Sequence, residues 1–474
     1  MNVTAYCSSV CLLALFLTKS VAADSASTSP APTQGNAATT TQLDVNDVSW
    51  LFPAPQSAAD MEKLISMDTL TSGTSTEPVW PITAFNQLVT IAASNGALVQ
   101  GARRINLPPE VTKDESVWRI AGIRIDPSAP GTSDDIIQKY GSAPQIRLIV
   151  QPVTVSGTSI KVNDIAVHLL YTFATGTDTS DPKGFPKILP DKQKFQQIVT
   201  DLVALKKLCA DAGIPTNGIQ LGVHPGLQQA DRVPDLLPNL RAFLSKYLDN
   251  AHLTGMAMMG LPNDFEPWIF VALPRLPNGN FFPLPSPGLP DPTKTAQMLS
   301  FQDTPHVIPT PATNNRNPII NALFVPPPQR SGVSTAVLFQ SGVDKNAAAV
   351  TGTDSTGKPI TDSAVKNSDI PDIVANPNFS HFFNTDCISC HTETTRRNIL
   401  SLGSGSFAFK PTSGISGLSE TVRSNNQWNL RNFGWFHSTF IGPAIIPAAT
   451  QRTANESAAA ADFINRMYLT NPPQ

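Results

Sequence analysis

The sequence has little charge, few cysteines and no long apolar run beyond its first residues. Charged residues make up 15% of the 474 residues, and the formal net charge is −3. This composition has no excess of basic residues that would bind a nucleic acid or an anionic membrane, so neither partner is expected. After the N-terminus nothing approaches the roughly 18 consecutive apolar residues of a membrane-spanning helix. No transmembrane segment is therefore expected beyond the first residues.

Several motifs of well-known enzyme classes are also absent from the sequence. It contains no glycine-rich phosphate loop, no nucleophile elbow and no zinc-binding helix motif. Proline, by contrast, is abundant at 43 residues, which indicates many turns and extended connections rather than a helical bundle.

The first residues have the pattern of an export signal. Val10–Leu17 is an apolar run of the right length, and Val21-Ala-Ala23 offers small residues for cleavage. The region ahead of the run lacks Lys and Arg, which is atypical. A polar tract follows at once, which argues against a buried helix. We expect a signal peptide at 1–23, a disordered linker at 24–44, and a mature protein that is periplasmic or secreted.

Removal of the signal peptide leaves three cysteines. A disulfide-stabilised secreted fold would use more of them and in even number. Cys209 falls on the apolar stripe of a helix predicted over 195–212, so it is interpreted as a buried structural thiol. Cys387 and Cys390 remain as a pair.

This pair lies in Cys387-Ile-Ser-Cys390-His391, and Cys-x-x-Cys-His is the attachment signature of c-type haem. On a helix, positions i, i+3 and i+4 share a face, so two sulfurs and one imidazole can converge on one flat ligand. The sulfurs of Cys387 and Cys390 would form thioethers with the haem vinyl groups, and His391 would be the proximal iron ligand. The motif predicts one covalent haem c.

Other interpretations of the pair stay open. A thioredoxin-like redox pair would need a βαβ context, which is not evident around residue 387. A zinc site would need further ligands, and no second cluster of Cys and His lies at a suitable spacing. A local disulfide would also suit an oxidising compartment.

Residues 377–474 resemble a small c-type cytochrome domain, in which a first helix carries the haem motif and a last helix packs across it. Phe379, Phe382 and Phe383 precede the motif, as apolar residues do in that family. Thr453-Ala-Asn-Glu456 has the pattern of a capping box that opens a last helix. The resemblance implies a small all-α haem domain that transfers electrons.

The sixth iron ligand departs from that family, where a Met between the two helices is usual. Met467 falls inside the last predicted helix, which favours a role in the core. His437 lies in the aromatic-rich segment 428–440 and is the candidate distal ligand, with a hydrogen-bonded loop histidine as the alternative. An open or water-bound iron is the third alternative. Arg396 and Arg397 are either partners for the haem propionates or part of a solvated helix face.

The N-terminal region, 45–345, is expected to be an α+β domain of unknown role with antiparallel strands, joined by a linker at 346–376 to the haem domain at 377–474. Its lone histidines and its methionine cluster are interpreted as structural. The expected strands are 144–152 and 164–173, around a turn at Ser156-Gly157, with 219–223, 268–273 and 335–340; the expected helices are 195–212 and 240–250; the histidines are His168, His224, His252 and His306, and the methionines Met256, Met258 and Met259.

Two functions follow from the motif. The favoured one is electron transfer in the periplasm with a redox partner protein, because no catalytic constellation can be named. The alternative is a haem-dependent redox enzyme whose substrate site lies in the N-terminal domain. A two-haem peroxidase is disfavoured, since the sequence has one Cys-x-x-Cys-His.

Overall fold

The computed structural model describes most of the chain between residues 42 and 285 and parts of the chain after residue 347. The described residues are 42–73, 75–93, 107–129, 131–132, 137, 141–180, 187–260, 269–282, 284–285, 348–353, 359–366, 370–378, 390–391, 393–394, 397–398, 403, 405, 407–412, 417–423, 431–437 and 444–470. The predicted signal peptide and nearly all of the predicted linker at 24–44 lie outside them, as do the strand predicted at 335–340 and His306.

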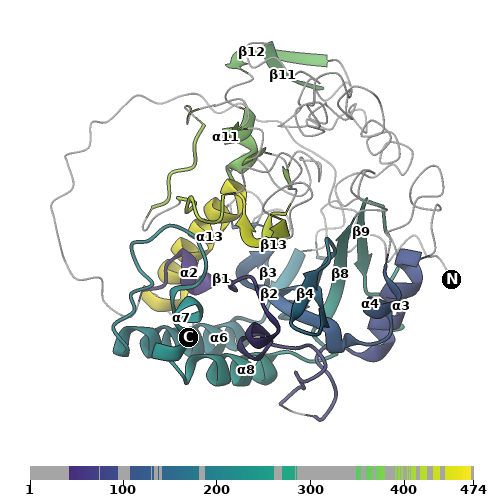
Figure 1. Ribbon diagram of the computed structural model, residues 1–474. Helices are drawn as coiled ribbons and strands as arrows, with labels where there is room; N and C mark the ends of the chain where they lie inside the picture. Colours follow the sequence, from purple (N-terminus) through teal and green to yellow (C-terminus); the bar gives the residue numbers. More distant parts are fainter. Residues whose placement is uncertain are drawn as a thin grey trace, which may run out of the picture.

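An antiparallel sheet of eight strands forms the centre of the described structure (Figure 1). Its strands follow the order β1-β2-β3-β5-β8-β9-β10, and β4 pairs with β3 beside this path. Their bounds are β1 Ser49–Leu51, β2 Trp118–Ala129, β3 Ala143–Ser156, β4 Ser159–Val162, β5 Ala166–Thr172, β8 Leu253–Gly260, β9 Ile269–Pro274 and β10 Leu284–Pro285. Helices and antiparallel sheets occur together, so the α+β class is confirmed.

The longest predicted strands are confirmed. The strand predicted at 144–152 lies in β3, the one at 164–173 contains β5, and the two pair antiparallel. The chain turns after β3 at Gly157, whose φ of 59° is one that glycine adopts without steric cost, and returns as β4. The strand predicted at 268–273 is β9.

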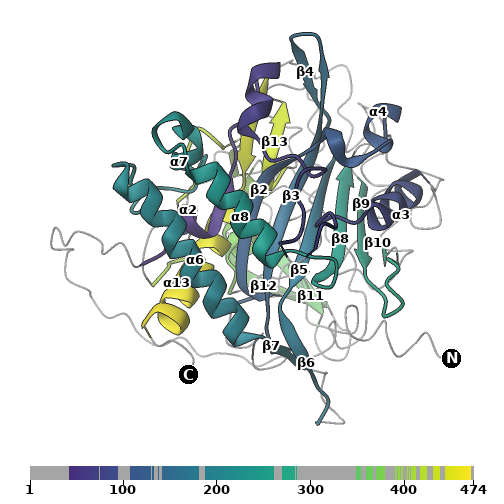
Figure 2. The same cartoon turned by 90° about the horizontal axis from the view of Figure 1, so that it is seen from below.

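Two long helices cover one face of the sheet, as Figure 2 shows from below. They are α6 (Lys192–Asp211), which includes the helix predicted at 195–212, and α8 (Leu236–Tyr247). Asp191 caps α6, since its Oδ1 accepts a hydrogen bond from the Lys194 amide at 2.9 Å. The apolar stripe of α6 is buried, including Cys209, so that thiol is structural as predicted.

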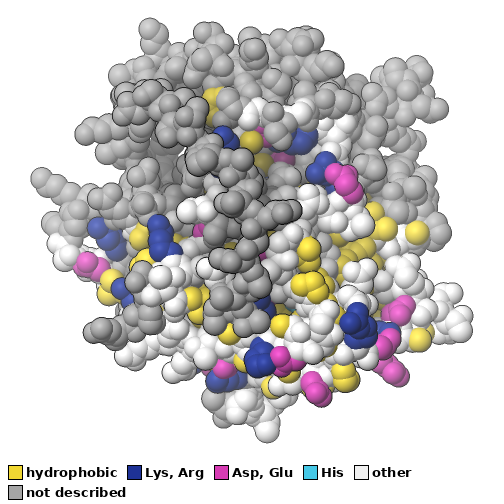
Figure 3. All heavy atoms as spheres, turned by 90° about the vertical axis from the view of Figure 1, so that its left-hand side faces the viewer, with side chains coloured by type: hydrophobic (Ala, Val, Ile, Leu, Met, Phe, Trp, Pro, Cys, Tyr) yellow, Lys and Arg dark blue, Asp and Glu magenta, His cyan; other side chains and the backbone are white. Residues whose placement is uncertain are grey.

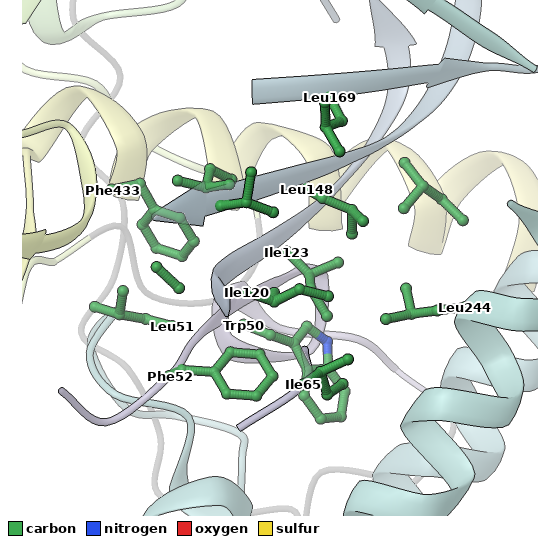
Figure 4. Close-up of a cluster of buried hydrophobic side chains, with 14 of the residues drawn as sticks. Trp50, Leu51, Phe52, Ile65, Ile120, Ile123, Leu148, Leu169, Leu244 and Phe433 are labelled. Atoms are coloured by element: carbon green, nitrogen blue, oxygen red, sulfur yellow. The ribbon is translucent and has the colours of Figure 1, made fainter. Parts of the chain in front are cut away.

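The core between these helices and the sheet joins side chains from distant parts of the sequence. In Figure 4, Leu244 of α8 lies beside Ile123 and Leu148 of the sheet, with Trp50 and Ile65 at the same level. Met256 and Met258 of β8 point into this core and Met259 points to the opposite face; all three are buried, which agrees with the packing role expected for them.

The remaining elements are short, apart from α3 and α13. They are α2 Val45–Val48, α3 Ile82–Ala93, α4 Pro109–Thr112, α7 Pro225–Gln228, α11 Ile370–Ala375, α13 Gln451–Ile464, the single-turn helices η2 Ala58–Lys63, η3 Glu115–Val117 and η4 Ala230–Arg232, the π-helical turn η6 Asn465–Thr470, and three strand pairs, β6 Ala174–Asp178 with β7 Lys187–Pro190, β11 Ala348–Thr353 with β12 Pro359–Lys366, and β13 Phe433–His437 with β14 Ile445–Ala449.

Three local predictions need correction. The strand predicted at 219–223 is wrong, because Leu221 and Val223 make only isolated bridges and no continuous ladder. The helix predicted at 240–250 begins earlier, at Leu236. The last helix begins at Gln451 rather than after Thr453: Thr450 is its cap, and the Thr450 hydroxyl accepts a hydrogen bond from the Thr453 amide at 3.3 Å.

The C-terminal part differs from the all-α domain that the resemblance implies. Of residues 377–474, the described part contains the antiparallel pair β13–β14 as well as α13. An all-α cytochrome-like domain is therefore not confirmed. Within 346–376, which was expected to be a linker, the described residues form β11, β12 and α11.

A buried ion pair joins α6 to the start of the described chain. Lys206 Nζ lies 2.6 Å from Asp47 Oδ2, and the two side chains are 4% and 1% exposed. Lys206 also donates to Asn217 Oδ1 and to the Gln42 carbonyl. Burial raises the pKa of Asp47, and the charge of Lys206 opposes that rise.

We predict that Lys206→Met lowers the free energy of unfolding by about 3–5 kcal/mol, because it leaves a buried carboxylate without its counter-charge. Lys207→Met is the matched control: its pair with Asp211 is 64% and 60% exposed, so it should cost about 0.5 kcal/mol or less. Urea titration at pH 7 measures both, and equal losses would show that the buried pair has no special role.

Candidate functional site

The face of the sheet opposite α6 and α8 carries polar side chains. Along β3 the residues alternate between the apolar Ile146 and Leu148 on one side and Gln145, Arg147 and Gln151 on the other. The strands next to β3 continue this polar face, because residues opposite each other in a ladder point to the same side. Arg147 thus lies opposite Arg124 of β2.

His168 of β5 belongs to the same face. It lies opposite Ile149 of β3 and opposite Ala257 of β8. In sequence it is one polar residue in an apolar strand. In the sheet Arg147 of β3 is one of its diagonal neighbours, since Arg147 lies opposite Leu170.

The C-terminal part of the chain covers this polar face. Arg124 NH1 donates to Glu456 Oε2 of α13 at 2.7 Å, and the hydroxyls of Ser49 and Ser457 lie 2.6 Å apart. Gln151 forms two hydrogen bonds with the backbone of Trp435 in β13, at 2.7 and 3.1 Å. Because buried polar groups need partners, these contacts fix α13 and β13 on the sheet.

Three guanidinium groups share two carboxylates at this contact. Arg124 pairs with Asp126 at 3.0 Å and with Glu456 at 2.7 Å, Arg147 pairs with Asp126 at 3.2 Å, and Arg452 pairs with Glu456 at 2.7 Å. The polar face therefore has more positive than negative charge in this network.

Arg431, just before β13, adds a fourth buried cation to the same region. Burial lowers the pKa of Arg431 to about 10, against the opposing effect of the Asp164 carboxylate. The group remains charged at neutral pH, so the region between sheet and C-terminal part favours anions.

The described part of the Cys-x-x-Cys-His run lies beside this region. It and the described residues up to Asn398 are called the motif helix below. Cys390 and His391 are helical and half-buried, and the described residues that follow them, Glu393, Thr394, Arg397 and Asn398, are helical too. The helical placement expected for the second half of the motif is thus observed. Cys387 lies outside the described residues.

The motif helix is held to the first turn of α13 by two side chains. The Arg452 amide donates to Glu393 Oε1 at 2.9 Å, and the Gln451 amide donates to Thr394 Oγ1 at 2.7 Å. These amides belong to the first turn of α13 and have no partner within that helix. Since α13 is bound to β2 through Glu456, the motif helix is positioned over the polar face of the sheet.

His391 and His168 interact electrostatically across this contact. Burial is the largest cause that lowers the pKa of His168, and the positive charges of Arg147, His391 and Arg431 lower it further. His168 is therefore neutral at neutral pH. The structure brings together two histidines that sequence analysis treated separately, one as a haem ligand and one as a structural residue.

The other residues considered for the haem are placed as follows. His437 is the last residue of β13, opposite Ile445, and its side chain lies outside what the structure describes. Met467 is 42% exposed on η6, so the core role expected for it is wrong. Arg397 is buried and pairs with Asp372 while donating to the Gly403 carbonyl at 3.1 Å, which excludes a solvated face for this residue. Arg396 lies outside the described residues.

The aromatic residues of β13 contact the sheet. Trp435 Nε1 donates to the Phe52 carbonyl at 3.0 Å. The ring of Phe433 occupies the space over Gly122, where an added Cβ would lie 2.6 Å from it. Trp428 and Phe440 of the same segment lie outside the described residues.

His168 could have been recognised from the sequence by one signal. In β3 and β5 the apolar residues alternate with Gln145, Arg147, Gln151 and His168, although both strands are otherwise apolar enough to be central. Polar residues at period two in central strands indicate a face that is buried against polar partners.

Within the described ranges, no group of three or more His, Cys, Asp or Glu side chains is placed to hold a metal ion. No helix in the described part of the chain has the length and apolar character needed to cross a membrane. On the face shown in Figure 3, basic and acidic side chains of the described residues are interspersed.

Comparison with protein-family models, with characterised proteins and with solved structures finds no match for this chain.

The contact between α13 and the sheet makes a prediction about acid stability. Burial opposes the ionisation of Glu456, but the charges of Arg452 and Arg124 outweigh it and hold its pKa well below the ordinary value of 4.5. A carboxylate with a lowered pKa stabilises the fold above its unfolded pKa, and this stabilisation is lost as the pH falls below about 4.5.

We therefore predict that Glu456→Gln lowers the free energy of unfolding by about 2 kcal/mol at pH 7, and that the difference from wild type shrinks as the pH falls from 4.5 to 2.5. Glu420→Gln is the control, because Glu420 is 78% exposed and pairs only with Arg423. Urea titrations along a pH series measure both. A loss for Glu456→Gln that does not change with pH would contradict the assigned ion pairs.

Proposed function

We propose that this chain carries one covalent haem c, attached through Cys387 and Cys390, with His391 as the proximal iron ligand, and that it transfers electrons. The observation that carries the proposal is the run Cys-x-x-Cys-His at 387–391. The helical placement of Cys390 and His391 supports it, because thioether and iron bonds to one flat ligand require a shared helix face.

The surroundings of the motif fit such a group. Cys390 and His391 are half-buried, so a porphyrin can reach them. The cations at the contact between the sheet and the C-terminal part, among them Arg147 of β3 and Arg431 before β13, suit the two propionate carboxylates that haem carries. A bound haem supplies an iron that exchanges single electrons with little change of its surroundings.

The proposal also covers the export of the chain, its redox partner and the fold of its C-terminal part. Export through the signal peptide at 1–23 delivers the chain to the periplasm, where covalent haem attachment of this kind is completed, and a redox partner protein takes or gives the electron. In the proposed haem domain, the motif helix and α13 correspond to the first and last helices of a c-type cytochrome domain. They contact each other through Glu393 and Thr394.

We expect that protein produced with the haem-maturation machinery and then denatured shows a pyridine haemochrome spectrum of the c type, at about one haem per chain. Cys387→Ser and Cys390→Ser should each shift the α-band, because one thioether is replaced by a free vinyl group. The double variant should release all haem on denaturation.

Cys209→Ala is the control for the loss of a thiol. Burial raises the pKa of Cys209 to about 12, so this thiol stays protonated, and its removal should leave covalent haem unchanged. Wild-type protein without covalent haem, with a 387–390 disulfide found by mass spectrometry, would refute the proposed function.

A further inference from the structure

His168 stands out among the buried titratable groups because the fold sets it opposite the proposed haem ligand. His224, which is fully buried, stacks on Trp50 at 3.7 Å and accepts a hydrogen bond from the Gly226 amide at 3.2 Å. His252 lies 2.7 Å from Asp249. These two rings have structural partners, whereas His168 is surrounded by cations and by His391.

Around His168 the polar face carries small and apolar side chains. Across the ladder on β8 it meets Ala257, with Gly255 opposite Leu170 and Met259 opposite Ala166. On β3 it lies opposite Ile149. The imidazole keeps part of its surface exposed although the C-terminal part covers this face, so a flat group can approach it.

The motif helix is fixed over the same face of the sheet through α13. Glu393 and Thr394 accept hydrogen bonds from backbone amides in the first turn of α13. The ion pair Arg124–Glu456 in turn holds α13 on β2. Arg124, Arg147 and His168 occupy neighbouring strands of one face. This chain of contacts holds the helix that carries His391 over the face that carries His168, and the electrostatic interaction of the two histidines agrees with this placement.

We propose that His168 of β5 is the second axial ligand of the haem iron, on the side opposite His391. This inference rests on the proposed function. Imidazole nitrogen is a common iron ligand. The sheet would then complete the haem site, and the N-terminal region would be part of the electron-transfer unit rather than a separate module.

Two histidine ligands determine what the iron can do. With both axial positions filled, the iron is six-coordinate and low-spin, and carbon monoxide does not bind without displacing a ligand. An imidazole as axial ligand, in place of the methionine sulfur, also lowers the reduction potential of the iron relative to the Met-ligated cytochromes.

The test is spectroscopic and uses the full-length haem protein. We expect ferric wild-type protein to give the electron paramagnetic resonance spectrum of a low-spin iron with two imidazoles. His168→Ala should keep one covalent haem per chain but lose the low-spin signal and bind carbon monoxide when reduced. Added imidazole should restore the low-spin signal, because it can occupy the space left by the side chain.

Two further variants make the test specific. His252→Ala removes a half-buried histidine at the start of the neighbouring strand and should leave the spectrum unchanged. His437→Ala removes the ligand that the sequence favoured and should also leave it unchanged. His168→Met should retain a low-spin iron with a raised reduction potential, which checks the site without creating a cavity.

The outcomes separate the two proposals. Wild-type protein without covalent haem refutes the proposed function and this inference together. Covalent haem with a high-spin iron, or a low-spin signal that survives His168→Ala but is lost in His437→Ala, overturns the role of His168 and leaves the haem attachment standing. If His168→Ala fails to fold, the wild-type spectrum and His168→Met still decide the ligand.

Discussion

The structure depends on the need to satisfy a polar sheet face that is buried. The opposite face of the same sheet is apolar and is covered by α6 and α8, as in most layered folds. The polar face instead requires hydrogen-bonding and charged partners, and it finds them in Glu456, Ser457 and the backbone of Trp435. This requirement places α13 and β13, and with them the helix that carries Cys390 and His391, on the sheet.

The sequence predicts the sheet well where packing follows a simple period. The paired strands β3 and β5 and the helix α6 are recognisable because their apolar residues recur at two or at about three and a half residues. The stretch around Leu221 has the composition of a strand but forms only isolated bridges with distant segments. Leu221 bridges to Leu418, and Val223 bridges to Leu51. Composition cannot show whether a partner strand is in reach.

The candidate site also has a part that can be predicted from local sequence and a part that depends on tertiary contacts. The motif at 387–391 is local, and its chemistry can be inferred from five residues. The position of His168 depends on the register of β5 against β3 and on the contact of α13 with β2, which are tertiary facts. The capping of the last helix was misplaced for a related reason: Glu456 matches a local capping pattern, but its carboxylate binds Arg124 from the sheet.

One pair of hydrogen bonds joins the two ends of the described chain. The Leu43 amide donates to Asn465 Oδ1 and the Asn465 side-chain amide donates to the Leu43 carbonyl, both at 2.8 Å. Contacts between residues so far apart in sequence give a high contact order, which slows folding. The chain must therefore wait for its last helix before the sheet is fully covered. Until then the polar face of the sheet lacks the partners that Glu456 and the Trp435 backbone supply.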